Sequence, residues 1–334
     1  MTAGGRNESG PARPATGVGD GPRVVRLSTR VDPFHDGWRL LEYLTHRFRY
    51  LDAATWQERL DARAVLVRGD AGARDTTVRR GDLVEYEVRV VEPPVDFSYE
   101  VLNSDDDLLA VAKSGNIPCH AGGSYFTHTL IARLRKDFGP GLDLRHRLDR
   151  ETSGVVVLTR HRRAARELAG AFARGEVAKE YAAVVHGRPA ADSFEVDAPV
   201  APVGPGHPVA RRVIDAARGR PARTLFRVTE RLGRFSVLEA RPQTGRTNQV
   251  RVHLEHAGHP IVGDKIYGVP EDLLEEARRD PSSARVAAHL MLPRHALHAS
   301  RLGLLHPGTR RLLTLEARLP DDLRAFIDSE REAA

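Results

Sequence analysis

The sequence predicts an α+β fold built on a mixed β-sheet. Short runs of apolar and β-branched residues, typical of strands, recur along most of the chain, whereas helical patterns are fewer and irregularly spaced. A parallel α/β fold would instead alternate strands and helices regularly. At 334 residues, 41% of them hydrophobic, the chain is long enough for two domains, or for one large domain with appendages, with a real core.

Composition narrows the class of protein. The net charge of +6 favours a polyanionic partner, nucleic acid first. The single cysteine, Cys119, excludes an internal disulfide framework and a cysteine-rich metal site. No run approaches the roughly 18 apolar residues of a membrane-spanning helix, and the N-terminus lacks the apolar core of a signal peptide. We therefore expect a cytoplasmic protein that does not bind membranes.

The N-terminal third predicts a leader and a small domain. Residues 1–23 are rich in Gly, Ala, Pro and Arg without periodicity, which predicts disorder. Residues 24–94 predict an independent unit, and Pro93-Pro94, which breaks both helix and strand ladder, marks the linker after it. Its expected elements are helices around 40–44 and 55–60, a strand at 64–67, a turn at Gly69-Asp70 and a strand after Gly81-Asp82.

Residues 95–330 predict a second, larger domain. Residues 188–221, rich in Pro, Gly and Ala, predict a surface excursion that carries Arg211 and Arg212. The expected elements are a hairpin at 101–102 and 108–113, a helix from Thr127 to near Lys136, a strand at 155–159, an amphipathic helix at 164–172 ended by Gly175, strands at 179–187, 224–228 and 235–240, a helix within 241–258, strands at 298–304 and 312–315, and a last helix around 323–326.

One loop concentrates groups that can do chemistry. The segment His146-Arg147-Leu148-Asp149-Arg150-Glu151-Thr152-Ser153-Gly154 directly precedes the apolar run at 155–159. A buried strand can hold Asp149 still, and the small residues after it allow the loop to pack closely around a carboxylate. Taken on residues alone, a polar turn in which Asp149 or Thr152 bonds nearby backbone is an equally good interpretation.

Two further motifs contain residues suited to a nucleic-acid base and a carboxylate. Lys179-x-Tyr181 places a phenol, with its stacking face and polar tip, on a predicted strand. Gly245-Arg246-Thr247-Asn248-Gln249-Val250-Arg251 places two arginines near a predicted helix, and a guanidinium can bind a carboxylate through two bonds. The structural alternatives are a core tyrosine and solvated helix charges.

Together the three motifs resemble the RluA-type pseudouridine synthase family. Every fixed position of His-Arg-Leu-Asp-x-x-Thr-Ser-Gly is matched. The chain departs from the family at Asn248, where a histidine is usual, and at Ser114, where a proline usually follows the lysine. The resemblance covers roughly residues 100–318 and implies the pseudouridine synthase fold, a bent, mixed and largely antiparallel sheet flanked by helices, with an RNA cleft.

The resemblance also implies a reaction and its residues. It implies isomerisation of uridine in ribosomal or transfer RNA to pseudouridine, without a metal or an organic cofactor. Asp149 is then the nucleophile, and attack on carbon 1′ of the ribose or on the base ring both stay open. Tyr181 lies against the target base and takes part in proton movement at its carbon 5, and Arg251 is the basic partner of Asp149.

The resemblance further implies the partners. Structured RNA is the expected substrate of a monomer that does not bind DNA. The residues expected to contact RNA are Arg147, Lys179, Arg246 and Gln249. The order of elements in 24–94 is similar to the small αL-type RNA-binding domain named after ribosomal protein S-four, although Val67-Arg68-Gly69-Asp70 replaces the usual Asn-Gly-Lys turn. A structural cap without RNA contact is the alternative for this unit.

Three other functions were weighed. A non-catalytic RNA-binding or RNA-chaperone protein does not require Asp149, Tyr181 and Arg251 together. His253, His256 and His259 are spaced three apart around Gly258, which does not converge them on a metal. Asp149 and Glu151 could suggest a glycoside hydrolase pair, but two residues of separation beside a strand would point them apart.

Overall fold

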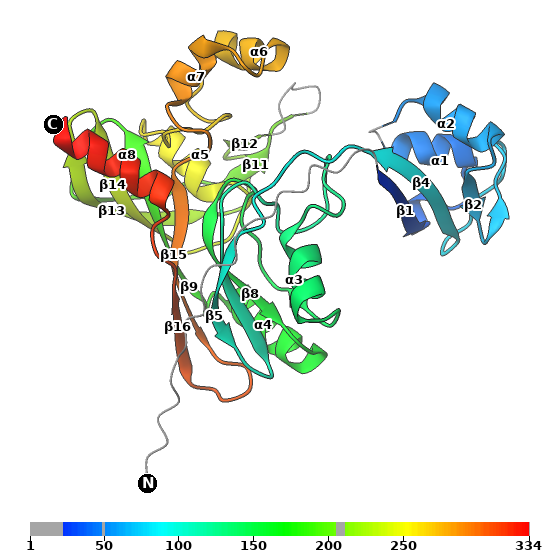
Figure 1. The fold of residues 1–334 in the computed structure, drawn as a ribbon, viewed down its shortest axis with the longest axis horizontal. Helices are drawn as coiled ribbons and strands as arrows, with labels where there is room; N and C mark the ends of the chain where they lie inside the picture. Colours follow the sequence, from blue (N-terminus) through cyan, green and yellow to red (C-terminus); the bar gives the residue numbers. More distant parts are fainter. Residues whose placement is uncertain (1–22, 49–50, 205–210, 334) are drawn as a thin grey trace. The chain divides into compact units, whose positions relative to one another are not determined.

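The computed structural model describes residues 23–48, 51–204 and 211–333. The predicted leader, residues 1–23, lies outside these ranges except for Arg23, which begins a strand. The described chain divides into two compact units (Figure 1), one running to Pro94 and including Ala121–His128, the other formed by Val95–His120 and Thr129 onward.

The smaller unit packs two helices on a four-stranded antiparallel sheet of order β1-β4-β2-β3. Asp52 caps the second helix by accepting a hydrogen bond from the Thr55 backbone N–H. Tyr43, Leu44 and Trp56 are fully buried at the centre of this core. The elements are β1 (Arg23–Arg30), a 3₁₀ turn (Pro33–His35), α1 (Leu40–Arg47), α2 (Ala53–Asp61), β2 (Val65–Val67), β3 (Asp70–Ala71) and β4 (Leu83–Val90).

The segment Ala121–His128 belongs to the smaller unit although it is distant in sequence. The Glu92 carboxylate accepts hydrogen bonds from the backbone N–H groups of Phe126, Thr127 and His128, at 2.7 to 2.9 Å, and Phe126 packs on the core of the unit. Desolvation opposes the charge of Glu92, but these bonds outweigh it and lower its pKa. The predicted range 95–330 therefore contains eight residues that pack with the other unit.

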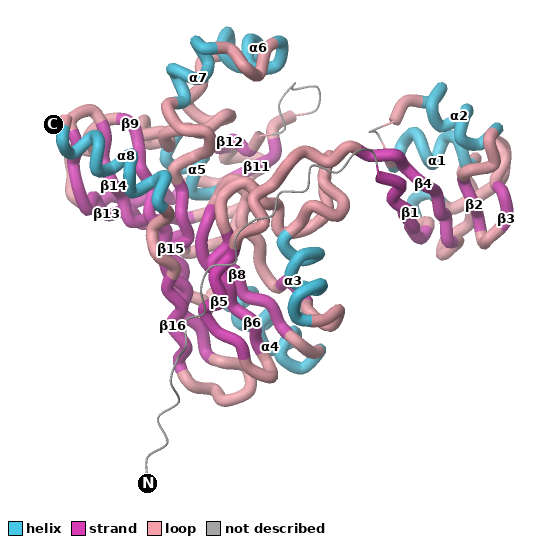
Figure 2. Tube along the Cα trace, viewed as in Figure 1, coloured by secondary structure: helices cyan, strands magenta, loops and turns pink. Residues whose placement is uncertain are grey.

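The larger unit is built on a ten-stranded mixed sheet (Figure 2). The strand order is β10-β13-β14-β9-β15-β8-β6-β5, with β16 added on β15 and β7 on β8. The strands are β5 (Tyr99–Ser104), β6 (Leu108–Lys113), β7 (Asp143–Leu144), β8 (Ser153–Thr159), β9 (Ala178–His186), β10 (Ser193–Asp197), β13 (Arg223–Leu232), β14 (Phe235–Pro242), β15 (Leu297–Leu305) and β16 (Leu312–Glu316). The predicted mixed, largely antiparallel sheet is confirmed.

Each half of the sheet has its own core. One core joins β9, β13, β14 and β15 to α5 and α8, and the other joins β6, β8, β15 and β16 to α4. Gly175 ends α4 in the left-handed conformation, as predicted. The helices are α3 (Leu130–Phe138), α4 (Arg162–Arg174), α5 (Gln249–His256), α6 (Glu271–Arg279), α7 (Ala284–Leu290) and α8 (Asp321–Glu332).

The two halves meet where β8 runs parallel to β15, the one parallel pairing between the described strands of this sheet. The pairing is short, His298 with Ser153 and Ala299 with Gly154. A side chain at Gly154 would put its Cβ 2.2 Å from the Ala299 carbonyl oxygen, and its φ of +113° also favours glycine. The end of the Asp149 loop is thereby fixed at the junction of the sheet.

The structure adds elements that the sequence analysis missed. Strand β1 and helices α6 and α7 were not predicted, and α3 begins at Leu130, capped by Thr129, rather than at Thr127. The stretch 188–221, predicted to be a surface excursion, contains strands that were not predicted. Besides β10, this stretch forms β11 (Val200–Pro202) and β12 (Arg212–Ile214), which pair with each other.

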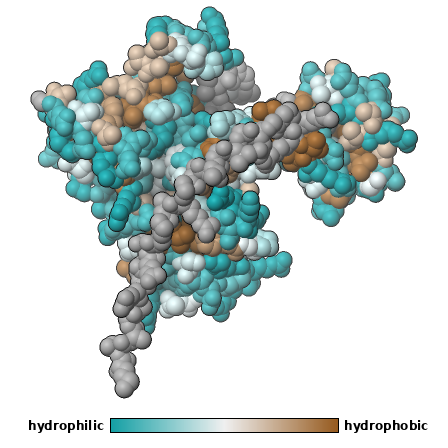
Figure 3. Space-filling view, in the orientation of Figure 1, coloured by the Kyte–Doolittle hydropathy of each residue, from teal (hydrophilic) through white to brown (hydrophobic). Residues whose placement is uncertain are grey.

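Polar residues cover most of the visible surface of each unit, with smaller apolar patches between them (Figure 3). None of the helices in the described ranges combines the length and the apolar character needed to cross a membrane.

Candidate active site

The loop that carries Asp149 is anchored on both of its sides. The Leu148 backbone N–H donates to the Cys119 sulfur, and the Arg150 carbonyl accepts from the Ile117 N–H and from the Lys113 ammonium, at 3.1 Å each. The Lys113 ammonium is buried at the end of β6, and this burial lowers its pKa to about 8. Asp149 thus lies between two fixed backbone groups.

The other fixed residues of the loop motif support the strand behind it. His146 accepts a hydrogen bond at Nε2 from the Val157 N–H, and burial lowers its pKa to about 4, so the ring is neutral. The Thr152 hydroxyl lies 2.7 Å from His295 Nε2, and the Ser153 hydroxyl lies 2.9 Å from His298 Nδ1. These contacts tie the loop to the segment that enters β15.

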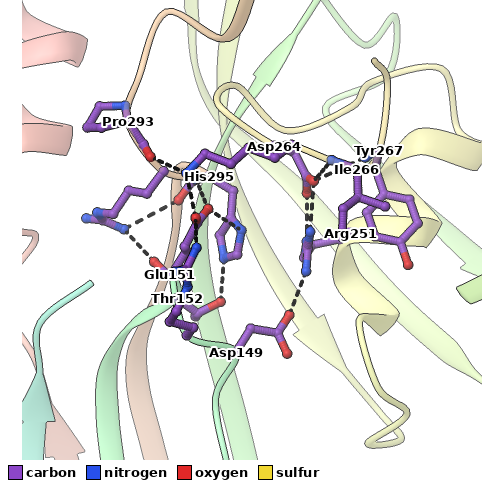
Figure 4. A network of polar contacts seen from close by, with 12 residues as sticks. Asp149, Glu151, Thr152, Arg251, Asp264, Ile266, Tyr267, Pro293 and His295 are labelled. Atoms are coloured by element: carbon purple, nitrogen blue, oxygen red, sulfur yellow. Dashed lines mark hydrogen bonds and ion pairs between the residues drawn. The ribbon is translucent and has the colours of Figure 1, made fainter. Parts of the chain in front are cut away.

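Arg251 links Asp149 to a second carboxylate (Figure 4). Its Nη1 donates to one oxygen of Asp149 at 2.9 Å, as predicted. Its Nε and Nη2 donate to the two oxygens of Asp264 at 2.6 and 2.8 Å. The Arg251 side chain is 7% exposed and that of Asp264 is fully buried, whereas Asp149 is 32% exposed. Hydrogen bonds and charge from Asp264 outweigh desolvation and raise the pKa of Arg251, so it stays a cation.

Asp149 and Tyr181 line a pocket of about 600 Å³ whose rim carries several cations. Tyr181 lies on β9, and its hydroxyl makes no hydrogen bond to any residue that the structure describes. Burial, and secondly the negative charge of Asp149, raise the pKa of Tyr181, so the phenol stays protonated. A protonated phenol beside a carboxylate can stack on a planar ring and hold or pass a proton.

The four residues expected to contact RNA all line this pocket, but they differ in how many of their polar groups are already bonded inside the chain. Arg147 is exposed and contacts His120, and Arg246 uses only Nε, on the Pro221 carbonyl. Lys179 donates to the Thr244 carbonyl at 3.2 Å, and burial lowers its pKa. Gln249 is buried, and its amide already bonds four groups inside the chain, so RNA contact by this residue stays a prediction.

The structure shows the contacts of Asn248, which stands where the family usually has a histidine. Asn248 has a φ of +57° and precedes α5, and asparagine adopts this left-handed conformation more readily than most residues. Its amide donates to the Tyr267 hydroxyl at 3.1 Å, and the Tyr267 ring lies against Arg251, with the guanidinium 4.9 Å from its centre. Asn248 therefore helps to hold the Tyr267 ring against the Arg251 guanidinium.

Asp264 was missed in the sequence analysis. Its signal was a Gly-Asp pair, Gly263-Asp264, directly after the buried pair Ile261-Val262. Gly263 has a φ of +75°, and a Cβ there would lie 2.2 Å from a backbone oxygen. The close packing that requires this glycine is visible only in the structure, so in the sequence the Gly-Asp pair marks a turn and does not identify the site.

The histidines weighed for a metal have other partners. His253 contacts the Thr224 hydroxyl and the Ala198 carbonyl, and His259 contacts the His186 carbonyl. Within the described ranges, the one group of side chains close enough together for a metal ion is Asp105, Asp107 and His306, away from Asp149.

Comparison with known proteins identifies the family to which the chain is similar. Residues 107–256 match the family described as RNA pseudouridylate synthase. "Ribosomal large subunit pseudouridine synthase D" of Nitrosomonas europaea is 34% identical over 238 residues, which cover 70% of this chain and 65% of that protein, slightly under two thirds of its length. The protein of the same name from Xanthomonas campestris pv. campestris is 32% identical over 307 residues, covering 89% and 90%.

A solved structure agrees with this placement. "Human RNA Pseudouridylate Synthase Domain Containing 4" superposes with a TM-score of 0.53 at 26% identity, covering 70% of this chain and 92% of that one. The resemblance drawn from the three motifs is confirmed, and the chain belongs to the RluA-type family of RNA pseudouridine synthases.

Proposed function

We propose that the chain isomerises specific uridines in ribosomal or transfer RNA to pseudouridine, with Asp149 as the nucleophile. One observation carries the proposal: the Asp149 carboxylate is held by a single hydrogen bond from Arg251 and opens into a pocket beside Tyr181. Among the described residues its second oxygen has no hydrogen-bond partner, so that oxygen is available to a group bound in the pocket.

The pocket volume suits one nucleotide rather than a helix of RNA. About 600 Å³ lies within the range of small-molecule sites. A uridine stacked in RNA cannot bring its ribose and base to a side chain at the floor of such a pocket, so it must first leave the stack. Tyr181 then offers the aromatic face that replaces the lost stacking.

The chemistry follows from an ionised carboxylate next to a uridine. Asp149 attacks carbon 1′ of the ribose or the base ring, the base detaches and rotates, and it rejoins the ribose through carbon 5. The proton on carbon 5 must then leave. The Asp149 carboxylate, free again once the base has rejoined through carbon 5, accepts this proton, and N1, which has lost its bond to the ribose, takes one up. The protonated Tyr181, close enough to Asp149 to feel its charge, takes up a proton only as it gives its own away, so it serves as a relay at the same base.

The cations around the pocket suit the RNA backbone. Arg147, Arg220 and Arg246 line its rim, and none of these guanidinium groups is paired with a carboxylate among the described residues. Phosphates would bind such free guanidinium groups, and the affinity should then fall as salt rises. Ribosomal RNA of the large subunit is the first substrate to test, because the relatives' names point to it.

We propose in addition that the smaller unit binds RNA through exposed arginines such as Arg63, Arg74 and Arg80. Deleting residues up to 94 would strip Phe126 of its core, so side-chain variants are the cleaner probe. Replacing these three arginines with glutamine should weaken RNA affinity and lower its salt dependence by about one unit per lost phosphate contact. The single-turnover rate at saturating RNA should not change, and a collapse of that rate would contradict the proposal.

The main test compares Asp149→Asn with the parent on ribosomal and transfer RNA transcripts, by mapping pseudouridine after a single turnover. The amide keeps the shape and removes the nucleophile, so product should vanish while the dissociation constant for RNA changes little. Asp328→Asn on α8 makes the same chemical change on an exposed residue paired with Arg331 and serves as the control. Turnover within about tenfold of the parent, a barrier change of only ~1.4 kcal/mol, would refute the assignment.

A further inference from the structure

The turn that begins at Asp264 contacts the Asp149 loop in two ways. Asp264 bonds Arg251, which bonds Asp149 (Figure 4). The next residue, Lys265, donates to the Glu151 carboxylate at 2.6 Å. Asp264 itself is fixed, because one of its oxygens also accepts the backbone N–H groups of Ile266 and Tyr267, at 2.9 and 3.1 Å.

The two carboxylates share Arg251 unequally. Asp264 accepts two hydrogen bonds from the guanidinium, one at each oxygen, while Asp149 accepts one. A planar guanidinium bound along one edge cannot rotate, so its remaining N–H points in a fixed direction. The Tyr267 ring lies against the guanidinium and limits its movement further.

The charges of the three residues sum to minus one when all are ionised. A lone arginine beside Asp149 would neutralise it and make its lone pairs less available. Asp264 already balances the charge of Arg251, so Asp149 receives a direction from the arginine and keeps most of its own negative charge. A nucleophile needs both properties.

On the basis of the function proposed above, we propose that Asp264 is a positioning residue for the reaction. It fixes Arg251 and balances its charge, so that Arg251 orients Asp149 without neutralising the Asp149 carboxylate. Asp264 is fully buried and is not part of the pocket lining, so it acts through Arg251 and does not touch RNA.

Other charged groups face this centre and must be separated from it in a pH experiment. Burial lowers the pKa of His295 far below the usual value, so it stays neutral, and Lys113, with a pKa of about 8, stays charged in acid. Tyr181 stays protonated throughout. The remaining charged groups at the centre are the carboxylates of Asp149, Glu151 and Asp264, and Glu151 is bound by Arg150 and Lys265.

The test measures single-turnover rates at saturating RNA across pH for Asp264→Asn and Asp264→Glu. Asp264→Asn removes the competing charge, so the acidic limb of the profile should move by about one unit to lower pH. The plateau rate should fall on the order of 10- to 100-fold, because the guanidinium is no longer fixed. Asp264→Glu keeps the charge but displaces it, so the rate should fall while the limb stays in place. RNA affinity should be unchanged in both.

Asp322→Asn is the matched control, because Asp322 also binds an arginine, Arg294, through both oxygens, at 2.7 and 2.9 Å. It should lower the melting temperature and leave the acidic limb of the rate-versus-pH profile in place. An Asp264→Asn variant whose limb and plateau match the parent overturns the proposal. If that variant does not fold, a parental rate in Asp264→Glu overturns it, and a lowered rate with unchanged affinity and limb supports it.

A second measurement does not depend on turnover. If Asp149 and Asp264 compete for Arg251, Asp149→Asn should lower the melting temperature more in the Asp264→Asn background than in the parent. If the two substitutions lowered the melting temperature additively, the proposal that Asp149 and Asp264 compete for Arg251 would be overturned. A parent that makes no pseudouridine would refute the proposed function alone, because the thermal cycle would still report on the pairing.

Discussion

Replacing Arg251 with methionine tests the charge arrangement of the site most directly. Methionine keeps much of the volume of the arginine stem but removes the cation that two carboxylates share. Asp264 has a fully buried side chain and, among the residues that the structure describes, would keep two backbone N–H groups as partners. Removing one partner of a buried ion pair typically costs about 3–5 kcal/mol of unfolding free energy. For a unit of this size, that corresponds to a melting temperature lowered by roughly 10 °C.

The same change should move the pH dependence of the reaction. A cation near a carboxylate favours its ionised form, and without Arg251 the two carboxylates face each other. Asp149 is then ionised only at higher pH, so the acidic limb of the single-turnover profile should move upward, opposite to the effect expected for Asp264→Asn. The plateau rate should also fall by about 100-fold or more, because Asp149 is no longer oriented.

Arg246→Met provides the comparison, because Arg246 lines the same pocket without a carboxylate partner. It should raise the dissociation constant for RNA and leave both the limb and the melting temperature in place. An Arg251→Met protein with an unmoved limb and parental stability would show that the pair with Asp149 has no energetic importance, and the reasoning above would fail with it.

Three further predictions follow from individual groups. Tyr181→Phe keeps the ring, so RNA affinity should survive while the rate at saturating RNA drops, and full activity would limit Tyr181 to stacking. Because the pKa of Lys113 is lowered to about 8 from 10.5, the unfolded chain binds more protons between these values, and stability should rise with pH there. The rise is at most about 3 kcal/mol, at ~1.36 kcal/mol per unit, and Lys113→Met should lack it when urea unfolding is compared at pH 8 and 10. Activity should survive exhaustive chelation, and a loss restored by one specific metal would contradict the cofactor-free reaction.

The loop and strand motifs were predictable because their signals are local. The apolar run before Thr159 identified β8, and Gly175 identified the end of α4. The pairing of Asp149 with Arg251 joins residues 102 apart in sequence and was reached only through the family resemblance. Asp264 had no such help, because a carboxylate in a turn looks the same whether it faces solvent or an arginine.

The missed elements have physical causes too. Strand β1 pairs along its whole length with β4, but arginines at 23, 26 and 30 interrupt the apolar pattern that predicts a strand. The strands between 188 and 221 are three to five residues long, and their Pro and Gly content conceals them. The affiliation of Ala121–His128 depends on Glu92, a long-range contact that periodicity cannot reveal.

The short parallel pairing at Gly154 has a consequence for how the enzyme comes into being. Asp149 and the loop around it are made early, but their supports, His295 and His298, follow about 145 positions later. Closing such a long loop is slow and gains nothing until the last strands dock. During synthesis the Asp149 loop should therefore stay unformed until β15 has left the ribosome, and a nascent chain stalled before residue 297 should bind no substrate base. The enzyme becomes competent in one late step, after nearly all of its length has been made.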